Sequence, residues 1–180
     1  TNWMRPGAGR DWLFVVALVL GAALTRLPGL GEPHEEYFDE VYHAKSARQY
    51  IAGEAPAEWV HPPVAKHLIS LGVRLFGYEP WAWRLAPAVF GIALAPIFYL
   101  LARRVTPSRR AARLAALLLL LDGVYLVQSR IAMTNIFAAF FQLLAMLLLL
   151  DAVLEEKLPT WRTLGAGAAF GLALSTRWTS

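Results

Sequence analysis

The chain has 180 residues, of which 57% are hydrophobic and only 17% are charged, and it contains no cysteine. A soluble domain of this length carries about 25% charged residues, so the composition predicts an all-α polytopic membrane protein. The net charge of +4 does not indicate a nucleic-acid partner, because the basic residues gather at the ends of apolar runs, as membrane-topology signals do. Without cysteine, disulfides and thiolate metal sites are excluded.

Several apolar runs are long enough to be predicted as membrane spans. The first run follows a short start that contains Arg5 and Arg10, so a cleaved signal peptide is the alternative to a membrane anchor. The last run reaches Ser180 without a polar tail, so we expect residues 1–180 to be a single but incomplete transmembrane domain, the N-terminal part of a longer one. The predicted spans cover residues 12–28, 81–102, 113–127, 132–150 and 164–178.

Residues 29–80 form a long loop between the first two runs. The pattern that begins at Phe38 predicts a short amphipathic helix that ends at Gly53. A second helix is predicted to begin after Pro62 and Pro63, because proline suits the first turn of a helix. This second helix is too short to span a bilayer, so we place it in the membrane interface. Its apolar residues recur at helical spacing: Val64, Leu68, Leu71 and Leu75.

The distribution of charge predicts the orientation of the chain. Five arginines lie in the connection at residues 103–113, and cytoplasmic connections of membrane proteins are rich in Lys and Arg. This connection and the N-terminus are therefore predicted to be cytoplasmic. The loop at 29–80, with eight acidic residues, is then predicted to lie on the outer face of the plasma membrane, together with Arg130 and Arg177.

Asp39 and Glu40 are adjacent carboxylates in this outer loop, so they cannot share one face of a helix. One of them can act as a general base that faces an aqueous cleft, while the other holds local structure. The alternative is that Asp39 only caps the N-terminus of the helix that follows.

Four basic side chains are candidates for binding a phosphate group. Arg130 lies between two aliphatic runs, and an arginine near bilayer depth is unfavourable unless it has an anionic partner. A lipid phosphate suits its planar guanidinium, either on a specific carrier or on an ordinary lipid headgroup. The other three candidates are His61 and Lys66, which are alternatively solvated residues around a helix start, and Arg177.

A metal site and a nucleotide site have little support. Acidic residues and histidines of the outer loop, such as Glu36 and His43, can supply ligands to a divalent metal. No spacing such as His-Glu-x-x-His fixes a metal site, and no glycine-rich loop is present to bind nucleotide phosphates.

Taken together, separate stretches resemble the protein O-mannosyltransferase family, which are polytopic enzymes of the GT-C glycosyltransferase class. Residues 38–41 (Phe-Asp-Glu-Val) resemble the acidic motif of its first outer loop, and residues 61–66 (His-Pro-Pro-Val-Ala-Lys) look like its His-Pro-Pro-x-x-Lys motif. Residues 121–132, with Gln-Ser-Arg, and residues 172–178 are similar to two further segments of the family. The order and spacing of these stretches agree across nearly the whole chain.

The resemblance implies a GT-C-type bundle that transfers mannose from a polyprenyl-phosphate carrier to serine or threonine hydroxyls of proteins, with no required cofactor. Asp39 would then be the base, and Glu40 would orient the loop or the acceptor. Arg130 would hold the carrier phosphate, with His61, Lys66 and Arg177 as further candidates for this contact.

One departure and two alternatives accompany this resemblance. Asn135 stands where many members carry an acidic residue. A related GT-C transferase that moves another sugar to a lipid or glycan is the alternative within the same class. A membrane transporter subunit is the alternative from another class, although transporters tend to place ionisable groups in the middle of their helices.

Overall fold

The computed structural model describes residues 11–154 and 160–178, and every regular element in these ranges is an α-helix. The prediction of an all-α chain is therefore confirmed. Arg5, Arg10 and the connection at 155–159 lie outside the described residues. In chain order the helices are α1 (Asp11–Arg26), α2 (Glu40–Ala52), α3 (Val64–Phe76), α4 (Pro80–Val105), α5 (Arg109–Leu121), α6 (Gly123–Gln128), α7 (Asn135–Leu154) and α8 (Thr160–Leu174).

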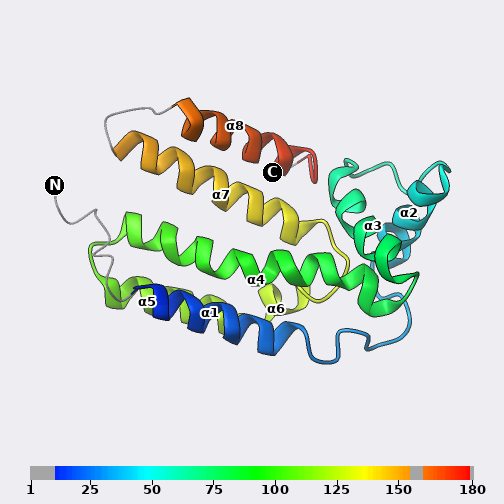
Figure 1. The fold of residues 1–180 in the computed structure, drawn as a ribbon, viewed down its shortest axis with the longest axis horizontal. Helices are drawn as coiled ribbons and strands as arrows, with labels where there is room; N and C mark the ends of the chain where they lie inside the picture. The colour runs from blue at the N-terminus through cyan, green and yellow to red at the C-terminus, as the bar shows by residue number, and fades with distance from the viewer. Residues whose placement is uncertain (1–10, 155–159, 179–180) are drawn as a thin grey trace.

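Helix α4 is the centre of an elongated bundle (Figure 1). It packs against α1, α5 and α7, while α8 covers α7, and α2 and α3 gather at one end of the bundle. Among the described helices, α4 is long and apolar enough to cross a membrane. The apolar part of α7, Asn135–Leu150, is shorter than the length needed to cross. Membrane crossing by the other predicted spans stays a prediction.

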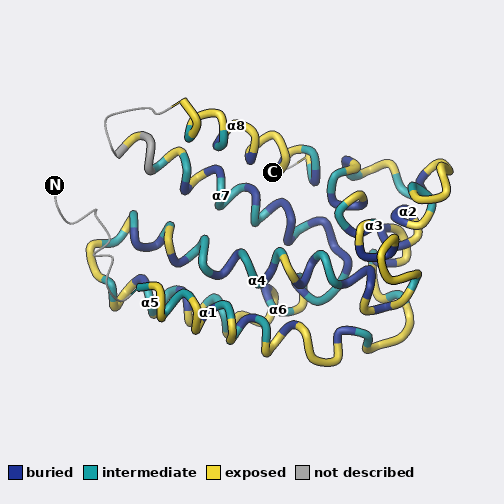
Figure 2. The backbone as a smooth tube through the Cα atoms, in the orientation of Figure 1, coloured by how far each residue is buried: buried dark blue, intermediate teal, exposed yellow. Residues whose placement is uncertain are grey.

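Buried residues follow the faces that the helices turn toward each other (Figure 2). The largest core cluster joins α3, α4 and α7, with Ile69, Trp83 and Phe137 among its members. A smaller cluster around Leu18 and Tyr99 joins α1 to α4 and α5. Many large apolar side chains are exposed on the outward faces of the helices. Exposed apolar surface on this scale is expected where helices face lipid.

The segment 113–127 differs from the continuous span that the sequence predicts. Helix α5 ends at Leu121 and α6 begins at Gly123, because Asp122 between them has an extended backbone (φ −69°, ψ 123°). The Asp122 carboxylate accepts a hydrogen bond from the Tyr125 N–H at 2.7 Å, which caps the start of α6. An aspartate favours such a capping position over a helix interior, so it divides the run.

The two short helices predicted within residues 29–80 are confirmed as α2 and α3. The face of α3 that packs inward is not the predicted apolar stripe. Gly53 ends α2 in the left-handed conformation (φ 72°), which glycine adopts without strain. In α3 the residues that pack inward include Ala65, Ile69 and Gly72, whereas Leu71 and Leu75 of the predicted stripe are exposed. The exposed stripe fits the predicted position of α3 in the membrane interface.

Gly72 brings α3 against the start of α4. A Cβ atom at this position would lie 2.1 Å from the carbonyl oxygen of Ala82, which belongs to the backbone and cannot rotate away. We expect Gly72→Ala to lower the free energy of unfolding by about 1–3 kcal/mol, because the overpacked helices must separate. The measurement is the thermal unfolding midpoint of the protein in detergent.

Gly167→Ala is the matched control, because Gly167 also lies inside a helix but has no atom within 4 Å of the added Cβ. The control is expected to be neutral or stabilising by up to about 1 kcal/mol, since alanine favours helix more than glycine does. Equal midpoints for the two variants would contradict the close contact between α3 and α4.

Candidate active site

A buried ion pair between Glu40 and Arg84 lies beside the candidate base. The two side chains are 0% and 1% exposed. The guanidinium donates from Nε to Oε1 at 2.8 Å and from Nη2 to Oε2 at 2.7 Å. This bidentate geometry is the strongest form of an arginine–carboxylate contact. It joins the first residue of α2 to the first turn of α4.

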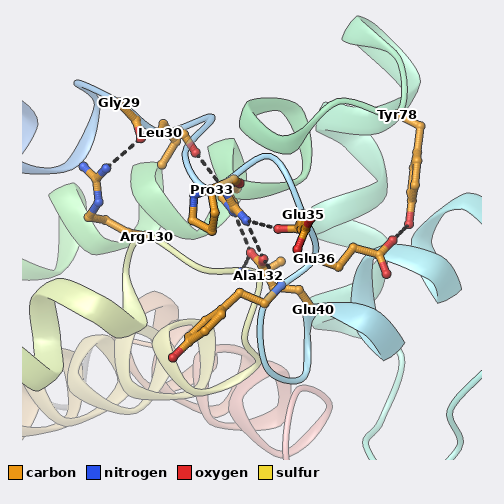
Figure 3. Close-up of polar contacts among 11 residues, drawn as sticks. Gly29, Leu30, Pro33, Glu35, Glu36, Glu40, Tyr78, Arg130 and Ala132 are labelled. Carbon is orange, nitrogen blue, oxygen red and sulfur yellow. Dashed lines mark hydrogen bonds and ion pairs between the residues drawn. The ribbon is translucent and has the colours of Figure 1, made fainter.

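The remaining donors of Arg84 are satisfied by the loop before α2. Its Nη1 donates to the carbonyl oxygens of Leu30 (3.2 Å) and Pro33 (2.7 Å), and its Nη2 donates to that of Glu35 (2.9 Å). These carbonyls surround the ion pair in the close-up view (Figure 3). Because a buried charge is stable only when it is paired and hydrogen-bonded, the path of this loop depends on Arg84.

The Glu40 carboxylate also binds two backbone N–H groups. Its Oε2 accepts from Tyr37 at 2.9 Å, within the same loop. Its Oε1 accepts from Ala132 at 2.8 Å, in the connection between α6 and α7 (Figure 3). Glu40 therefore links the start of α2 and the loop before it to α4 and to the connection between α6 and α7, which are far apart in the sequence.

Asp39, next to Glu40, lacks such side-chain contacts with the described residues. It is half-buried at the N-cap position of α2, where its side chain makes no capping hydrogen bond. Its carboxylate has no hydrogen bond or ion pair with any residue that the structure describes, whereas its backbone carbonyl accepts from Tyr42 and His43. Phe38 before it has a left-handed backbone (φ 57°) and is 66% exposed. Such a conformation is unfavourable for a residue with a side chain, and it occurs often at functional sites.

His61 and Lys66 meet around Glu58, which the sequence did not single out. The buried Lys66 ammonium donates to a Glu58 carboxylate oxygen (2.8 Å) and to the carbonyls of Glu58 (2.9 Å) and His61 (2.8 Å). The Glu58 carboxylate also accepts from the His61 N–H at 2.6 Å and lies 3.1 Å from its ring Nδ1. All three N–H donors of Lys66 are used. In this structure His61 and Lys66, which were predicted to bind phosphate, therefore stabilise the loop that contains Glu58.

His43 lies beneath this group with 2% of its side chain exposed. Its Nδ1 is 3.8 Å from Glu58 Oε2, and its ring meets that of His61 edge to face at 5.5 Å. Neither ring nitrogen has a hydrogen-bond partner among the described residues. Burial lowers the pKa of His43 to about 4, and the Glu58 carboxylate offsets only part of this effect. Burial acts to raise the pKa of Glu58, but hydrogen bonds from Lys66 and His61 outweigh it, so that pKa is lowered. His43 is therefore neutral near pH 7.

The half-buried Arg130 binds the C-terminal end of α1. Its Nη1 donates to the carbonyls of Thr25 (3.0 Å), Arg26 (2.9 Å) and Pro28 (2.9 Å), and its Nη2 donates to that of Gly29 (2.9 Å; Figure 3). A cation is favourable there because the last carbonyls of a helix carry partial negative charge. Phosphate binding by Arg130 stays a prediction, since its four described partners are neutral carbonyls that do not compensate its charge. No contact joins Arg130 to Asp39 within the described ranges.

The half-buried Arg177 has an unusual partner. Its guanidinium donates to the side-chain oxygen of Asn135, whose amide donates to Gln128 at 3.0 Å. Since Asn135 is neutral, this contact does not compensate the charge of Arg177. Beside this chain of contacts lies a largely apolar cavity of about 330 Å³, lined by Gln128, Asn135, Leu94, Leu119, Ile136 and Leu143, among others.

The end of α8 is joined to the segment that contains His61. The Trp178 indole donates to the Val60 carbonyl at 2.8 Å, and the Val64 N–H donates to the Ser175 carbonyl at 3.1 Å. Arg177 is therefore held on the same side of the molecule as the His-Pro-Pro segment, although more than a hundred residues separate them in the sequence.

Two residues of the site, Arg84 and Glu58, were missed by the sequence reasoning. Arg84 had a usable signal, because it lies inside the predicted span 81–102, and an arginine in an apolar run needs an anionic partner as much as Arg130 does. Glu58 had no such signal, since its partner Lys66 lies eight residues away across two prolines.

The sequence matches known families and proteins along most of its length. Residues 60–180, and separately residues 16–83, match families described as "Dolichyl-phosphate-mannose-protein mannosyltransferase". The polyprenol-phosphate-mannose–protein mannosyltransferase of Mycolicibacterium smegmatis is 31% identical, over 94% of this chain and 39% of that protein. That of Corynebacterium glutamicum is 36% identical, over 93% of this chain and 38% of that protein. The chain thus spans about two fifths of the length of these relatives.

Solved structures of two membrane glycosyltransferases share the fold. The S. cerevisiae protein O-mannosyltransferase Pmt1-Pmt2 complex, bound to the sugar donor, matches with a TM-score of 0.87 and 25% identity, over 98% of this chain and 27% of that chain. ArnT from Cupriavidus metallidurans, bound to undecaprenyl phosphate, matches with a TM-score of 0.71 and 23% identity, over 96% of this chain and 33% of that chain. These matches confirm the predicted GT-C-type helix bundle.

Removal of Arg84 tests the dependence of the outer loop on the buried ion pair. We expect Arg84→Gln to lower the free energy of unfolding by about 3–5 kcal/mol, because the Glu40 carboxylate then stays buried without a cation. The loop before α2 should become sensitive to protease, since three of its carbonyls lose their donor. Arg74→Gln is the control, because Arg74 is exposed on α3. Equal protease sensitivity in the two variants would refute the dependence.

Acid should destabilise the protein through His43. Because its pKa is lower in the folded than in the unfolded chain, stability is complete above about pH 6.5 and falls as the pH approaches 4, by about 3 kcal/mol in total. Glu58, whose folded pKa is also lowered, adds a further loss only below its ordinary value of 4.5. The thermal unfolding midpoint between about pH 6.5 and pH 4.5 therefore reports on His43.

His43→Leu should flatten this pH dependence, since neither ring nitrogen has a hydrogen bond to lose. His34→Gln is the control and should keep the slope, because His34 is 79% exposed. An unchanged slope in the leucine variant would exclude His43 as the titrating group.

Proposed function

This chain belongs to the protein O-mannosyltransferase family, and from this membership we propose that it serves the transfer of mannose from a polyprenyl-phosphate carrier to serine or threonine hydroxyls of proteins. The names of the curated relatives support this donor and this class of acceptor, and they favour a transferase over a transporter subunit. The observation that carries the proposed mechanism is the contrast between the two adjacent carboxylates. Glu40 is buried and fully bonded, whereas Asp39 is unpartnered in the part of the chain that the structure describes.

Asp39 is the general base in this mechanism. Its carboxylate can accept a proton without first breaking a bond to the protein, and it is accessible enough to meet a substrate hydroxyl. Glu40 is a positioning residue, since its oxygens are occupied by Arg84, Tyr37 and Ala132. By holding the Tyr37 N–H on one side and α4 on the other, Glu40 fixes where Asp39 points.

The reaction is a single displacement with inversion at the anomeric carbon. The acceptor hydroxyl oxygen forms the new bond to that carbon, and its proton passes to Asp39. The bond from the anomeric carbon to the carrier phosphate breaks, and its electron pair leaves with the phosphate. Cations that face the phosphate oxygens stabilise the charge that develops there.

Arg177 is the proposed contact for the carrier phosphate. Its described partner is the neutral Asn135, so its charge is available to an anion, whereas Lys66 is paired with the Glu58 carboxylate. Arg130, whose described partners are neutral carbonyls, is the second candidate for this contact. The adjacent apolar cavity of about 330 Å³ suits the first part of a polyprenyl chain. In this arrangement the end of the bundle that carries α2 and α3 faces the outside of the cell.

Asp39→Asn tests the base. In the full-length protein we expect the rate of mannose transfer to fall at least about a hundredfold, because general-base catalysis contributes on the order of 10²–10⁴. The measurement is transfer from labelled polyprenyl-phosphate mannose to a serine- or threonine-containing peptide in membranes. Donor binding should be unchanged. Glu54→Gln is the control, because Glu54 is an exposed carboxylate of the same loop.

Arg177→Gln is the complementary variant in the same assay. We expect its donor affinity to fall by about tenfold, as for the loss of a charged hydrogen bond, with a smaller effect on the rate at saturating donor. Exposed Arg74→Gln is the control. Wild-type transfer by the Asp39 variant would end the assignment of the base alone. No transfer of mannose to any peptide by the wild-type protein would overturn the proposed function itself.

A further inference from the structure

A second charged cluster lies at the opposite end of the bundle from α2 and α3, where α4 ends and α1 and α5 begin (Figure 1). We call it the arginine corner and define it by Asp11, Arg103, Arg109 and Arg113. It takes no part in the transfer mechanism proposed above. In the part of the chain that the structure describes, its guanidinium groups from Arg103, Arg109 and Arg113 all lie near the one Asp11 carboxylate.

The shared carboxylate holds these arginines only loosely. Arg113 Nη2 donates to Asp11 Oδ1 at 3.2 Å, whereas Arg109 Nη1 is 3.8 Å and Arg103 Nε is 3.6 Å from the carboxylate oxygens. Two of these distances are longer than a hydrogen bond. With Arg104 and Arg110 in the same connection, five arginines lie within residues 103–113.

Several guanidinium donors in the corner have no acceptor among the described residues. Arg103 is 4% exposed, yet its Nε and Nη1 lack a hydrogen-bond partner there, and so does Arg113 Nε. A buried charged donor without an acceptor is unfavourable, so the corner has unused capacity for anionic oxygens.

The rim of the corner is open and lies beside apolar surface. The side chains of Arg109 and Arg113 are 42% and 37% exposed, so an anion can reach them from outside. Helix α5 starts at Arg109 with Ser108 as its N-cap, and the partial positive charge of a helix start also favours an anion. The neighbouring outward residues are aliphatic or aromatic: Trp12, Leu13, Leu114, Leu117 and Leu118.

We propose that the arginine corner binds the phosphate group of an anionic membrane phospholipid, whose acyl chains lie along the exposed apolar residues of α1 and α5. Arg109 and Arg113 form the entrance, and Arg103 supplies the buried donors. Asp11 competes with the phosphate for the same guanidinium groups. The apolar wall beside the arginines favours a lipid over a free phosphate ion, because a free ion gains nothing from it.

The test uses the full-length protein in phosphatidylcholine nanodiscs that contain a small fraction of photoactivatable phosphatidylglycerol, with the yield of crosslinked lipid as the readout. Arg103→Lys keeps the charge but removes the planar fork of donors, and we expect it to lower the yield about tenfold. Arg110→Lys is the matched control on an exposed arginine of the same connection and should change the yield little.

Asp11→Asn distinguishes a lipid site from a purely structural ion cluster. If Asp11 competes with the phosphate, this variant should raise the crosslink yield, a gain that misfolding cannot produce. A lower or unchanged yield would overturn the proposal. So would equal losses in the Arg103 and Arg110 variants, which indicate general attraction between charges. Displacement of the probe by excess inorganic phosphate as readily as by unlabelled phosphatidylglycerol would instead assign the site to a soluble anion.

Discussion

The end of the bundle that carries α2 and α3 depends on one buried ion pair. Moving a carboxylate and a guanidinium out of water is unfavourable by several kcal/mol per ion, and their mutual attraction compensates only when every other donor and acceptor is satisfied. Glu40 and Arg84 meet this condition through backbone groups of the outer loop and of the α6–α7 connection. The same contacts that stabilise the pair therefore specify the path of the loop, whereas the neighbouring Asp39 carboxylate makes no hydrogen bond or ion pair with the described residues.

The cations near α2 and α3 differ in the charge of their partners. Lys66 is paired with the Glu58 carboxylate and also donates to two backbone carbonyls. Arg130 and Arg177 bind neutral oxygens among the described residues, those of backbone carbonyls and of Asn135. Residue type alone does not separate these cases, because the partner of each cation is set by the fold.

The backbone preferences of single residues predicted where several helices begin and end. Pro62 and Pro63 marked the start of α3 and Gly53 marked the end of α2, because the backbone preferences of these residues act within a few positions. The break at Asp122 was equally local and was overlooked inside an apolar run. The contacts of Glu40 with Arg84 and Ala132 were beyond such reasoning, since they join residues 44 and 92 positions apart. The packed face of α3 was also beyond it, because a neighbouring helix on one side and lipid on the other both accept apolar side chains.

The hydrogen bonds between the end of α8 and the His-Pro-Pro segment have a consequence for biosynthesis. A chain emerges from the ribosome N-terminus first, and its parts fold as they become available. Residues 60–64 are made early, yet the Ser175 carbonyl and the Trp178 indole that complete their bonding are made last among the described residues. The hydrogen bonds of residues 60–64 therefore remain incomplete while the helices between them and α8 are synthesised, and they form only after α8 is made.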